Sequence, residues 1–456
     1  MKQKISLLFL LVFMKINAQC WNMVATGQFH TVAIKNDGTL WAWGSNNQGQ
    51  LGDNSFINKL TPIQIGTDTD WQYVTAGYYH TVALKNDGTL WAWGANTNGE
   101  LGDGTNVSKN VPTRIGNEFN WDKIATGNDY NLALKNDGTL WAWGYNLHGC
   151  LGDGTLISRN YPVQIGSSNN WQSVSAGGNF STAIRTDNTL WSWGWNFYGQ
   201  LGRQITLNDP NPAQIGFDND WQNVYSGNLY SFAIKSNGTM WGWGYSQAGC
   251  MGNGNNGNNV SVTSTPIQIG NQNDWQSVSV GDQYALAIKT NGTLWGWGDN
   301  SLGQLGDGTT IYKYITTQIG SDINWSNISC KKWSTALIKS DSSLFTCGRN
   351  SYGQLGDGSN INRNTPTLVN CIILNVNSIQ KDLFSIYPNP VADILYLSKT
   401  ADTLIDKIYV IDITGQKVIE QSGVISNIDV NKLESGIYML VILFGNDKLT
   451  YKIIKG

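Results

Sequence analysis

The sequence predicts an all-β fold, a seven-bladed β-propeller followed by a small β-sandwich. The first observation is a segment that returns seven times at nearly constant spacing. The second is composition: the 456 residues include 52 Gly and 21 Trp but only 9 Pro, and Gly-rich turns among many aromatic residues are typical of chains of short strands. The third is a two-residue alternation within each repeat, which favours strands over helices.

Each repeat begins with a tryptophan, and these tryptophans are 50 residues apart except for one interval of 54. The additional residues of the longer interval fall in the Asn- and Gly-rich run 252–259, which predicts a loop insertion. The best-preserved segment, Lys85–Gly94, reads K-N-D-G-T-L-W-A-W-G. The repeats start at Trp21, Trp71, Trp121, Trp171, Trp221, Trp275 and Trp325.

The segment around Asp87 predicts a tight hairpin, because the Asn-Asp-Gly turn supplies a residue that tolerates positive φ. Both faces of this hairpin carry apolar side chains, so each sheet needs cover on both sides. A ring of sheets packed face to face gives that cover, whereas a two-layer sandwich would leave polar outer faces. The predicted opposed pairs are Leu84 with Leu90, Ala83 with Trp91, and Thr81 with Trp93.

We expect four strands per blade. For the blade that begins at Trp71 they are residues 71–76, 80–85, 89–94 and 62–65, the last supplied by the preceding repeat. The W-x-W pair is interpreted as packing between blades, because each buried tryptophan removes roughly 150–250 Å² from water.

The repeats resemble those of the regulator of chromosome condensation family, whose signature combines G-x-x-H-T, W-G and N-x-x-G-Q-L-G. The resemblance extends over about residues 21–370 and implies the seven-bladed propeller. The seventh and fourth repeats depart most from the signature. The departures are Lys331 for the Gly, Phe345 and Cys347 for the Trp pair, and Arg203-Gln204 for the Asp-Gly turn of the fourth repeat.

After Asn370 the repeat stops, and alternating or apolar β runs with a D-x-x-G turn predict a β-sandwich over residues 384–456. Its Y-P-N-P start, G-I-Y strand and basic last strand resemble the C-terminal sorting domain of type IX secretion substrates. That resemblance implies a Bacteroidota-type Gram-negative host, passage across the outer membrane, and removal of the domain with release or lipopolysaccharide anchoring. An ordinary adhesive sandwich module is the alternative.

The first residues are typical of a signal peptide: Lys2 and Lys4 precede a largely apolar run, 5–14, and Ala18 offers a cleavage site. That run is too short to span a bilayer, and we expect no transmembrane segment. A net charge of -3 with 13% charged residues leaves no basic face for nucleic acid. The predicted organisation is signal peptide 1–18, propeller 19–370, linker 371–383 and sorting domain 384–456.

Six cysteines in an exported chain predict disulfides. By repeat position, Cys371 and Cys20 correspond to Thr67 and Asp70, the two ends of a short loop between neighbouring strands. That loop is missing where the chain's ends meet, so a Cys20–Cys371 disulfide is predicted to replace it. The ends of a turn lie within about 7 Å, which suits a disulfide. Cys150 and Cys250 are expected to be buried free cysteines. Whether Cys330 and Cys347 form a disulfide within the seventh blade is left open.

No catalytic, metal or cofactor site is predicted. His30 and His80 recur as the H of G-x-x-H-T, which favours a structural role, because no Asp or Cys cluster accompanies them. The L-G-D-G-T segments lack the D-x-D-x-D-G spacing and closing Glu of a calcium loop, and a phosphate-binding Gly loop needs a following helix.

The candidate binding positions are the residues that follow the Gly of G-x-x-H-T. They vary between repeats yet stay aromatic, and equivalent positions of a propeller lie at one end of the ring. Aromatic loops on a rigid scaffold are how binding faces are built, although each aromatic could instead pack against the next blade. The candidates are Phe29, Tyr78, Tyr79, Tyr130, Phe180, Tyr230, Tyr284 and Trp333, with a weaker set, Tyr145, Trp195, Phe197, Tyr198 and Tyr245, after W-G.

The predicted function is that of a secreted or cell-surface, non-catalytic, monomeric propeller that binds a protein or a glycan. One alternative is an inhibitor of a partner enzyme, because one bacterial group in the resembled family inhibits β-lactamases. Another is a polysaccharide-acting enzyme, for which only Asp129 and Asp282 supply carboxylates on that end. The family's nucleotide-exchange role on a small GTPase is not expected outside a eukaryotic nucleus.

Overall fold

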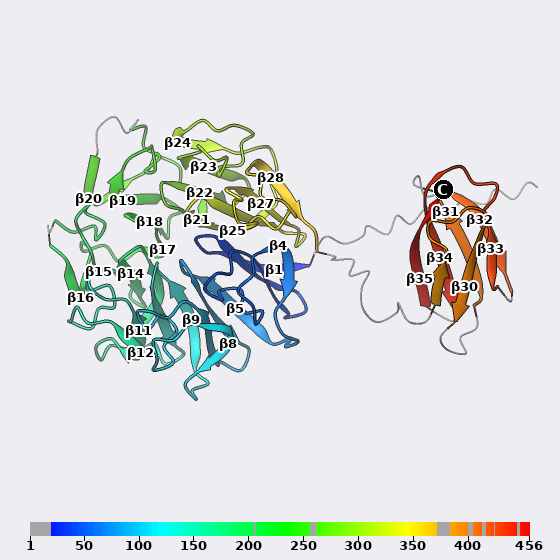
Figure 1. Cartoon of the computed structure of the whole chain (residues 1–456). Helices are drawn as coiled ribbons and strands as arrows, with labels where there is room; N and C mark the ends of the chain where they lie inside the picture. Colours follow the sequence, from blue (N-terminus) through cyan, green and yellow to red (C-terminus); the bar gives the residue numbers. More distant parts are fainter. Residues whose placement is uncertain are drawn as a thin grey trace, which may run out of the picture. The chain divides into compact units, whose positions relative to one another are not determined.

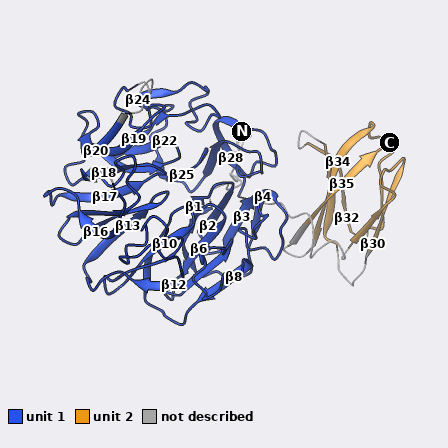
Figure 2. Ribbon diagram, turned by 60° about the vertical axis from the view of Figure 1, so that its left-hand side comes forward, with its two compact units in different colours: residues 1–372 blue, residues 373–456 orange. Residues whose placement is uncertain are grey.

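The computed structural model describes residues 20–204, 207–255, 261–371, 384–399, 405–412, 416–423, 425–444 and 447–456. The predicted signal peptide and all but the first residue of the predicted linker lie outside these ranges. The chain forms two compact units, residues 1–372 and 373–456 (Figure 2). Among the described residues no helix is long and apolar enough to cross a membrane.

The first unit is a ring of seven four-stranded antiparallel sheets, each built from four consecutive strands (Figure 1). The first strand of every sheet contacts the first strands of the two neighbouring sheets, and β25 contacts β1, so the ring is closed. This confirms the seven-bladed propeller. The first strands are β1 (Trp21–Thr26), β5 (Trp71–Ala76), β9 (Trp121–Thr126), β13 (Trp171–Ala176), β17 (Trp221–Ser226), β21 (Trp275–Val280) and β25 (Trp325–Lys331).

The second and third strands form the predicted hairpin. Leu84 is paired with Leu90, Ala83 with Trp91 and Thr81 with Trp93, as the turn at Asp87 predicts. The second strands are β2 (His30–Lys35), β6 (His80–Lys85), β10 (Tyr130–Lys135), β14 (Phe180–Arg185), β18 (Tyr230–Lys235), β22 (Tyr284–Lys289) and β26 (Ser334–Lys339). The third strands are β3 (Leu40–Gly44), β7 (Leu90–Gly94), β11 (Leu140–Gly144), β15 (Leu190–Gly194), β19 (Met240–Ser246), β23 (Leu294–Gly298) and β27 (Leu344–Gly348).

The fourth strand corrects one expectation. Residues 62–65 do not join the blade that begins at Trp71; β4 pairs with β3 of its own repeat. Antiparallel neighbours need only a returning loop, and residues 45–58 provide it, so each blade is one continuous stretch of chain. The fourth strands are β4 (Lys59–Gln64), β8 (Lys109–Ile115), β12 (Arg159–Gln164), β16 (Asp209–Gln214), β20 (Ser261–Gln268), β24 (Lys313–Gln318) and β28 (Arg363–Val369).

The second tryptophan of each W-x-W pair joins neighbouring blades. Trp93 is fully buried, and its Nε1 donates a hydrogen bond of 2.9 Å to the carbonyl of Gln50 in the preceding blade. Trp91 is half-buried and packs edge-on against Trp71, with ring centroids 5.7 Å apart. The predicted packing between blades is therefore performed mainly by the second tryptophan.

The ring closes through complete blades and a disulfide. Blade 7 (β25–β28) and blade 1 (β1–β4) exchange no strand. The Cys20–Cys371 disulfide is present, with Cα atoms 6.0 Å apart, as predicted. Lys35 donates to the carbonyl of Cys371 at 3.0 Å, whereas Lys85 in blade 2 pairs with aspartates of the connecting loop that blade 1 lacks. The remaining four cysteines are buried free thiols, so Cys330 and Cys347 of the seventh blade form no disulfide with each other.

The second unit is a β-sandwich, as predicted. One sheet has the order β29-β30-β33 and the other β32-β31-β34-β35. Buried side chains from both sheets, including Leu395, Ile408 and Leu440, form one core. The strands are β29 (Phe384–Tyr387), β30 (Ile394–Lys399), β31 (Lys407–Ile411), β32 (Lys417–Ser422), β33 (Asn427–Asp429), β34 (Gly436–Phe444) and β35 (Asp447–Lys455).

Candidate binding face

Two sets of loops lie at one end of the ring, which we call the loop end. The short loops between first and second strands are tied to the long loops between third and fourth strands by backbone hydrogen bonds. Ser45 N donates to the carbonyl of Phe29, and Ala95 N to that of Tyr79, both at 2.8 Å. The opposite end of the ring, which carries the Asn-Asp-Gly turns, is the turn end. Both sets of predicted aromatic positions therefore belong to the loop end.

Four of the predicted binding aromatics are not on the surface. They occupy the first position of the second strand, three residues after the Gly, where blades 1 and 2 have His30 and His80. Burial there is complete because the side chain fills the interface with the next blade; the Tyr284 hydroxyl, for example, donates to the carbonyl of Ser334 at 2.6 Å. The proposal that these residues contact a ligand is therefore wrong for Tyr130, Phe180, Tyr230 and Tyr284.

The two histidines have the structural role that their recurrence predicts. His30 and His80 are fully buried, and Nε2 of His30 lies 3.1 Å from Oγ1 of Thr81 in the next blade. Nε2 of His80 lies 2.9 Å from Oδ1 of Asn131. Burial, reinforced by the charges of His80 and Lys331, lowers the pKa of His30 to about 3, so this imidazole is neutral.

The other four predicted aromatics, Phe29, Tyr78, Tyr79 and Trp333, are partly exposed and lie together at the ring closure. Phe29 is the centre: its ring lies 4.9 Å from that of Tyr352 and 6.4 Å from that of Tyr79. Tyr78 and Tyr79 are also in edge contact at 6.4 Å. With Lys332, Arg349 and Tyr352, these residues form what we call the closure cluster, which spans blades 7, 1 and 2.

Two cations of the closure cluster lie over its rings. The Lys332 ammonium is 4.7 Å from the Tyr78 ring and 5.4 Å from the Trp333 ring. The Arg349 guanidinium is 4.9 Å from Phe29 and 5.0 Å from Trp333. Cation–π contacts of this kind contribute about 0.5–1 kcal/mol each at exposed sites. Sequence reasoning missed Arg349, although it directly follows Gly348, which occupies the Gly position of W-G in the seventh repeat.

The weaker set of aromatics also gathers, on blades 3, 4 and 5. Trp195 stacks on His148 at 5.3 Å and contacts Tyr198 at 5.8 Å. Tyr198 in turn lies 4.8 Å from Tyr245, and Phe197 is 69% exposed. In the part of the chain that the structure describes, no lysine or arginine lies over the rings of this second cluster, unlike those of the closure cluster.

Lys331 blocks the axis of the ring next to the closure cluster. From blade 7 its ammonium reaches blade 3, where it donates to the carbonyls of Thr126 at 3.0 Å and Gly127 at 3.2 Å. Burial lowers the pKa of Lys331 to about 8, and burial raises the pKa of nearby Asp129 to about 6. On the other side of Lys331 an axial cavity of about 380 Å³ is lined by the first strands.

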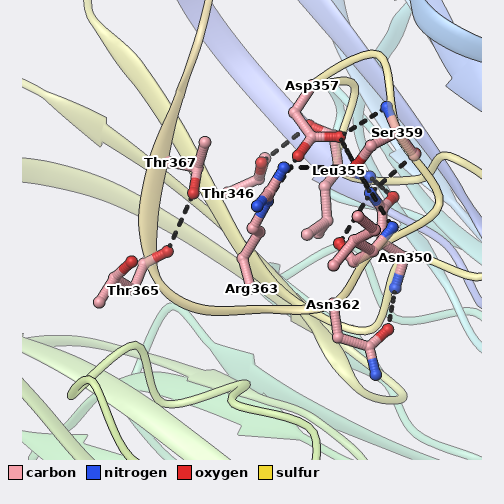
Figure 3. A network of polar contacts seen from close by, with 10 residues as sticks. Thr346, Asn350, Leu355, Asp357, Ser359, Asn362, Arg363, Thr365 and Thr367 are labelled. Carbon is pink, nitrogen blue, oxygen red and sulfur yellow. Dashed lines mark hydrogen bonds and ion pairs between the residues drawn. The ribbon is translucent and has the colours of Figure 1, made fainter.

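The long loops are held by an internal polar network, shown for blade 7 in Figure 3. Asn350 donates to Asp357 at 3.0 Å and accepts from the backbone N–H of Leu355 at 2.9 Å. Arg363 donates to the other Asp357 oxygen at 2.7 Å. Burial disfavours the charged carboxylate, but hydrogen bonds from Ser359 and Arg363 outweigh it and hold the pKa of Asp357 below its ordinary value. In the described ranges no group of three or more His, Cys, Asp or Glu is placed to hold a metal.

Comparison with known families gives matches to both units. The Regulator of chromosome condensation (RCC1) repeat matches residues 37–84, 87–134, 137–184, 187–234, 237–288 and 341–380, together more than half of the chain. A second form of the same repeat matches four segments within residues 71–304. The Secretion system C-terminal sorting domain matches residues 385–456.

Solved structures with the same fold share little sequence with this chain. Prp20p from Saccharomyces cerevisiae, described with its binding to Gsp1p and histones, is 22% identical over 68% of this chain and 80% of its own, with a TM-score of 0.62. Human WBSCR16 is 21% identical over 69% and 85%, with a TM-score of 0.61. Yeast RCC1 (Prp20) in complex with Kap60 is 15% identical over 84% and 90%, with a TM-score of 0.66. At these identities the likeness concerns the fold alone.

Proposed function

The chain belongs to the RCC1 repeat family and ends in a secretion sorting domain, and on this basis we propose that it is a non-catalytic binding propeller. The sorting domain indicates export by type IX secretion, so the protein is secreted or displayed at the cell surface. We further propose a Bacteroidota-type Gram-negative host. The ligand is a protein or a glycan, held at the loop end.

The observation that carries this proposal is the closure cluster. Phe29, Tyr79 and Tyr352 place aromatic rings side by side at the loop end. Trp333 is linked to Phe29 through Arg349, and all four rings are partly exposed. Partly exposed aromatics on rigid supports carry a large share of binding energy at recognition surfaces, because they lose little conformational entropy. The supports here are rigid because each loop is bonded to a strand end or to the neighbouring blade.

Absence of catalysis is part of the proposal. Asp129 and Asp282, the two carboxylates predicted on this end, both lie beside lysines: Asp282 is 3.4 Å from the Lys332 ammonium, and the charge of Lys331 acts on Asp129. Turnover of a host polysaccharide that is abolished by Asp129→Ala would contradict this part and favour an enzyme.

The proposal is tested by affinity capture with the full-length protein and with a Tyr79→Ala, Trp333→Ala variant. We expect the variant to lose the captured partner, because two ring surfaces of the cluster are removed. The control is Phe119→Ala, which removes a 60% exposed aromatic near the turn end. Equal capture by all three proteins would refute a role for the closure cluster.

A further inference from the structure

Arg349 lies at the loop end among basic side chains that already have partners. In six blades one lysine or arginine of the long loop or of the start of the fourth strand pairs with an aspartate. Lys332 pairs with Asp282, and Lys331 donates to backbone carbonyls. Arg349 takes part in none of the ion pairs found among the described residues. The paired side chains are Lys59, Lys109, Arg159, Arg203, Lys313 and Arg363.

The surroundings of Arg349 hold its guanidinium while using only its Nε donor. Phe29 and Trp333 lie at 4.9 and 5.0 Å from its centre, and its Nε donates to the hydroxyl of Ser351 at 3.1 Å. The terminal N–H groups have no hydrogen-bond acceptor among the described residues. A guanidinium whose position is fixed by aromatic rings is a preorganised fork for a planar carboxylate, which it binds through two parallel hydrogen bonds.

The local charge also favours an anion. Lys332 offsets Asp282. Burial and the charge of Glu100 raise the pKa of Asp129 to about 6, against the charge of Lys331. Arg349 itself is in contact with aromatic rings and not with a carboxylate of the described residues. Blades 1 and 2 have Ser45 and Ala95 at the position of Arg349, so this cation is a feature of the seventh blade alone among the three blades of the cluster.

We propose that the closure cluster binds a carboxylate-bearing polysaccharide, with Arg349 pairing with a uronate carboxylate and Phe29, Tyr352 and Trp333 stacking on sugar rings. This inference rests on the proposed function and names its ligand class.

Two observations favour a polysaccharide over an acidic peptide. The hollow lined by Tyr78, Asn128 and Lys332 measures only about 20 Å³, which is room for one water and not for an anchoring side chain. Strand addition is the other common mode of peptide recognition, and it needs a free sheet edge. In each blade the last strand is the outer edge of the sheet, on the rim of the ring (Figure 1), whereas the residues of the closure cluster lie in loops and on no edge strand. Flat rings beside a fixed guanidinium suit the planar faces of an acidic sugar chain.

The test measures binding of the full-length protein to polygalacturonate, to its fully methyl-esterified form and to polyglutamate. We expect polygalacturonate to bind about ten-fold more tightly or better than the ester, which keeps the sugar rings and lacks the charge. Arg349→Gln is expected to weaken polygalacturonate binding by about ten-fold or more, and Arg349→Lys to recover less than half of that loss in free energy, because lysine lacks the planar fork. Arg114→Gln is the matched control, because Arg114 also stacks on an aromatic ring, Phe119 at 4.5 Å, but near the turn end.

Equal binding of the acid and its ester, wild-type affinity of Arg349→Gln, or an equal effect of Arg114→Gln would overturn the proposal. Tighter binding of polyglutamate than of polygalacturonate would also overturn it and assign the cluster to an acidic protein. Failure here is distinguishable from failure of the proposed function. If Tyr79→Ala, Trp333→Ala abolishes capture of a partner while polygalacturonate does not bind, the binding face stands and the ligand class is wrong.

Discussion

Arg203 and Asp209 form in blade 4 an ion pair whose charges are exchanged relative to the other blades. Nη1 of Arg203 lies 3.0 Å from Oδ2 of Asp209. In five other blades the aspartate belongs to the long loop and the cation to the fourth strand. The fourth repeat has Arg203-Gln204 in place of the Asp-Gly turn, yet it keeps the ion pair between long loop and fourth strand with the two charges exchanged. The equivalent pairs are Asp53–Lys59, Asp103–Lys109, Asp153–Arg159, Asp307–Lys313 and Asp357–Arg363.

This reversal predicts that the fold tolerates exchange of the two charges only when Arg203 and Asp209 are substituted together. Arg203→Asp and Asp209→Arg should each lower the free energy of unfolding by about 1–2 kcal/mol, because two like charges then face each other in a partly buried site. The double variant should recover most of the loss, measured by denaturant unfolding as a double-mutant cycle. Additive losses in the double variant would show that the pair does not act as a unit.

Two tryptophans at equivalent positions should differ in importance. Trp297 donates to the carbonyl of Cys250, which accepts no other hydrogen bond among the described residues, whereas the Gln50 carbonyl bonded by Trp93 also accepts from Thr81. Trp297→Phe therefore leaves a buried carbonyl unpaired and Trp93→Phe does not. We expect Trp297→Phe to be the more destabilising by about 1–2 kcal/mol in chemical denaturation. Equal losses, or a larger loss for Trp93→Phe, would contradict this reasoning.

The buried histidines predict a loss of stability in acid. The pKa of His30 is about 3 in the folded protein, against an ordinary value of 6.5. Between these values the unfolded chain binds more protons, so stability is full above pH 6.5 and falls as pH drops toward 3. At pH 5 this amounts to about 2 kcal/mol for His30. The pKa of His80 is also lowered, by burial.

His30→Tyr with His80→Tyr should flatten this dependence, because blade 5 uses a tyrosine there that reaches the carbonyl of the next blade, Tyr230 to Tyr284 at 2.8 Å. The measurement is thermal unfolding from pH 4 to 8. His148→Gln is the control, since its side chain is partly exposed. An unchanged slope in the double variant would contradict the assignment.

The Cys20–Cys371 disulfide should contribute strongly to stability. It joins residues 351 positions apart, and chain entropy for a loop of that size corresponds to about 6 kcal/mol. Cys20→Ser with Cys371→Ser should lower the melting temperature, whereas Cys150→Ser should not reproduce the loss of the crosslink. Mass spectrometry after alkylation in denaturant should find four modified cysteines without reduction and six with it. Six without reduction would contradict the bond.

Local pairing could be predicted from sequence because it depends on neighbours in the chain. The turn at Asp87 alone determines the partners of Leu84 and Trp93, and both partners are as predicted. The fourth strand could not be assigned in this way, because residues 59–64 follow a long loop and have a blade on either side in the sequence. The disulfide could be predicted from the sequence because alignment of the repeats shows which connecting loop is missing where the ring closes.

The binding face was predicted only in part. Counting three residues from each Gly would have separated Tyr130 from Tyr79, since the first aligns with the buried His80 and the second precedes it. No local signal could show that Lys331 reaches Thr126, about 200 positions away, because that contact exists only across a closed ring. For the same reason the sandwich of Arg349 between Phe29 and Trp333 becomes visible only when blades 7 and 1 meet.

The disulfide at the ring closure has a consequence for survival outside the cell. It turns residues 20–371 into a covalent circle that contains all seven blades. A protease that cuts one exposed loop opens this circle but releases no fragment, because the two new ends remain joined through the crosslink. Detachment of the sorting domain beyond Cys371 leaves the circle untouched. The propeller can thus be processed at its end and nicked once within a loop while remaining a single molecule.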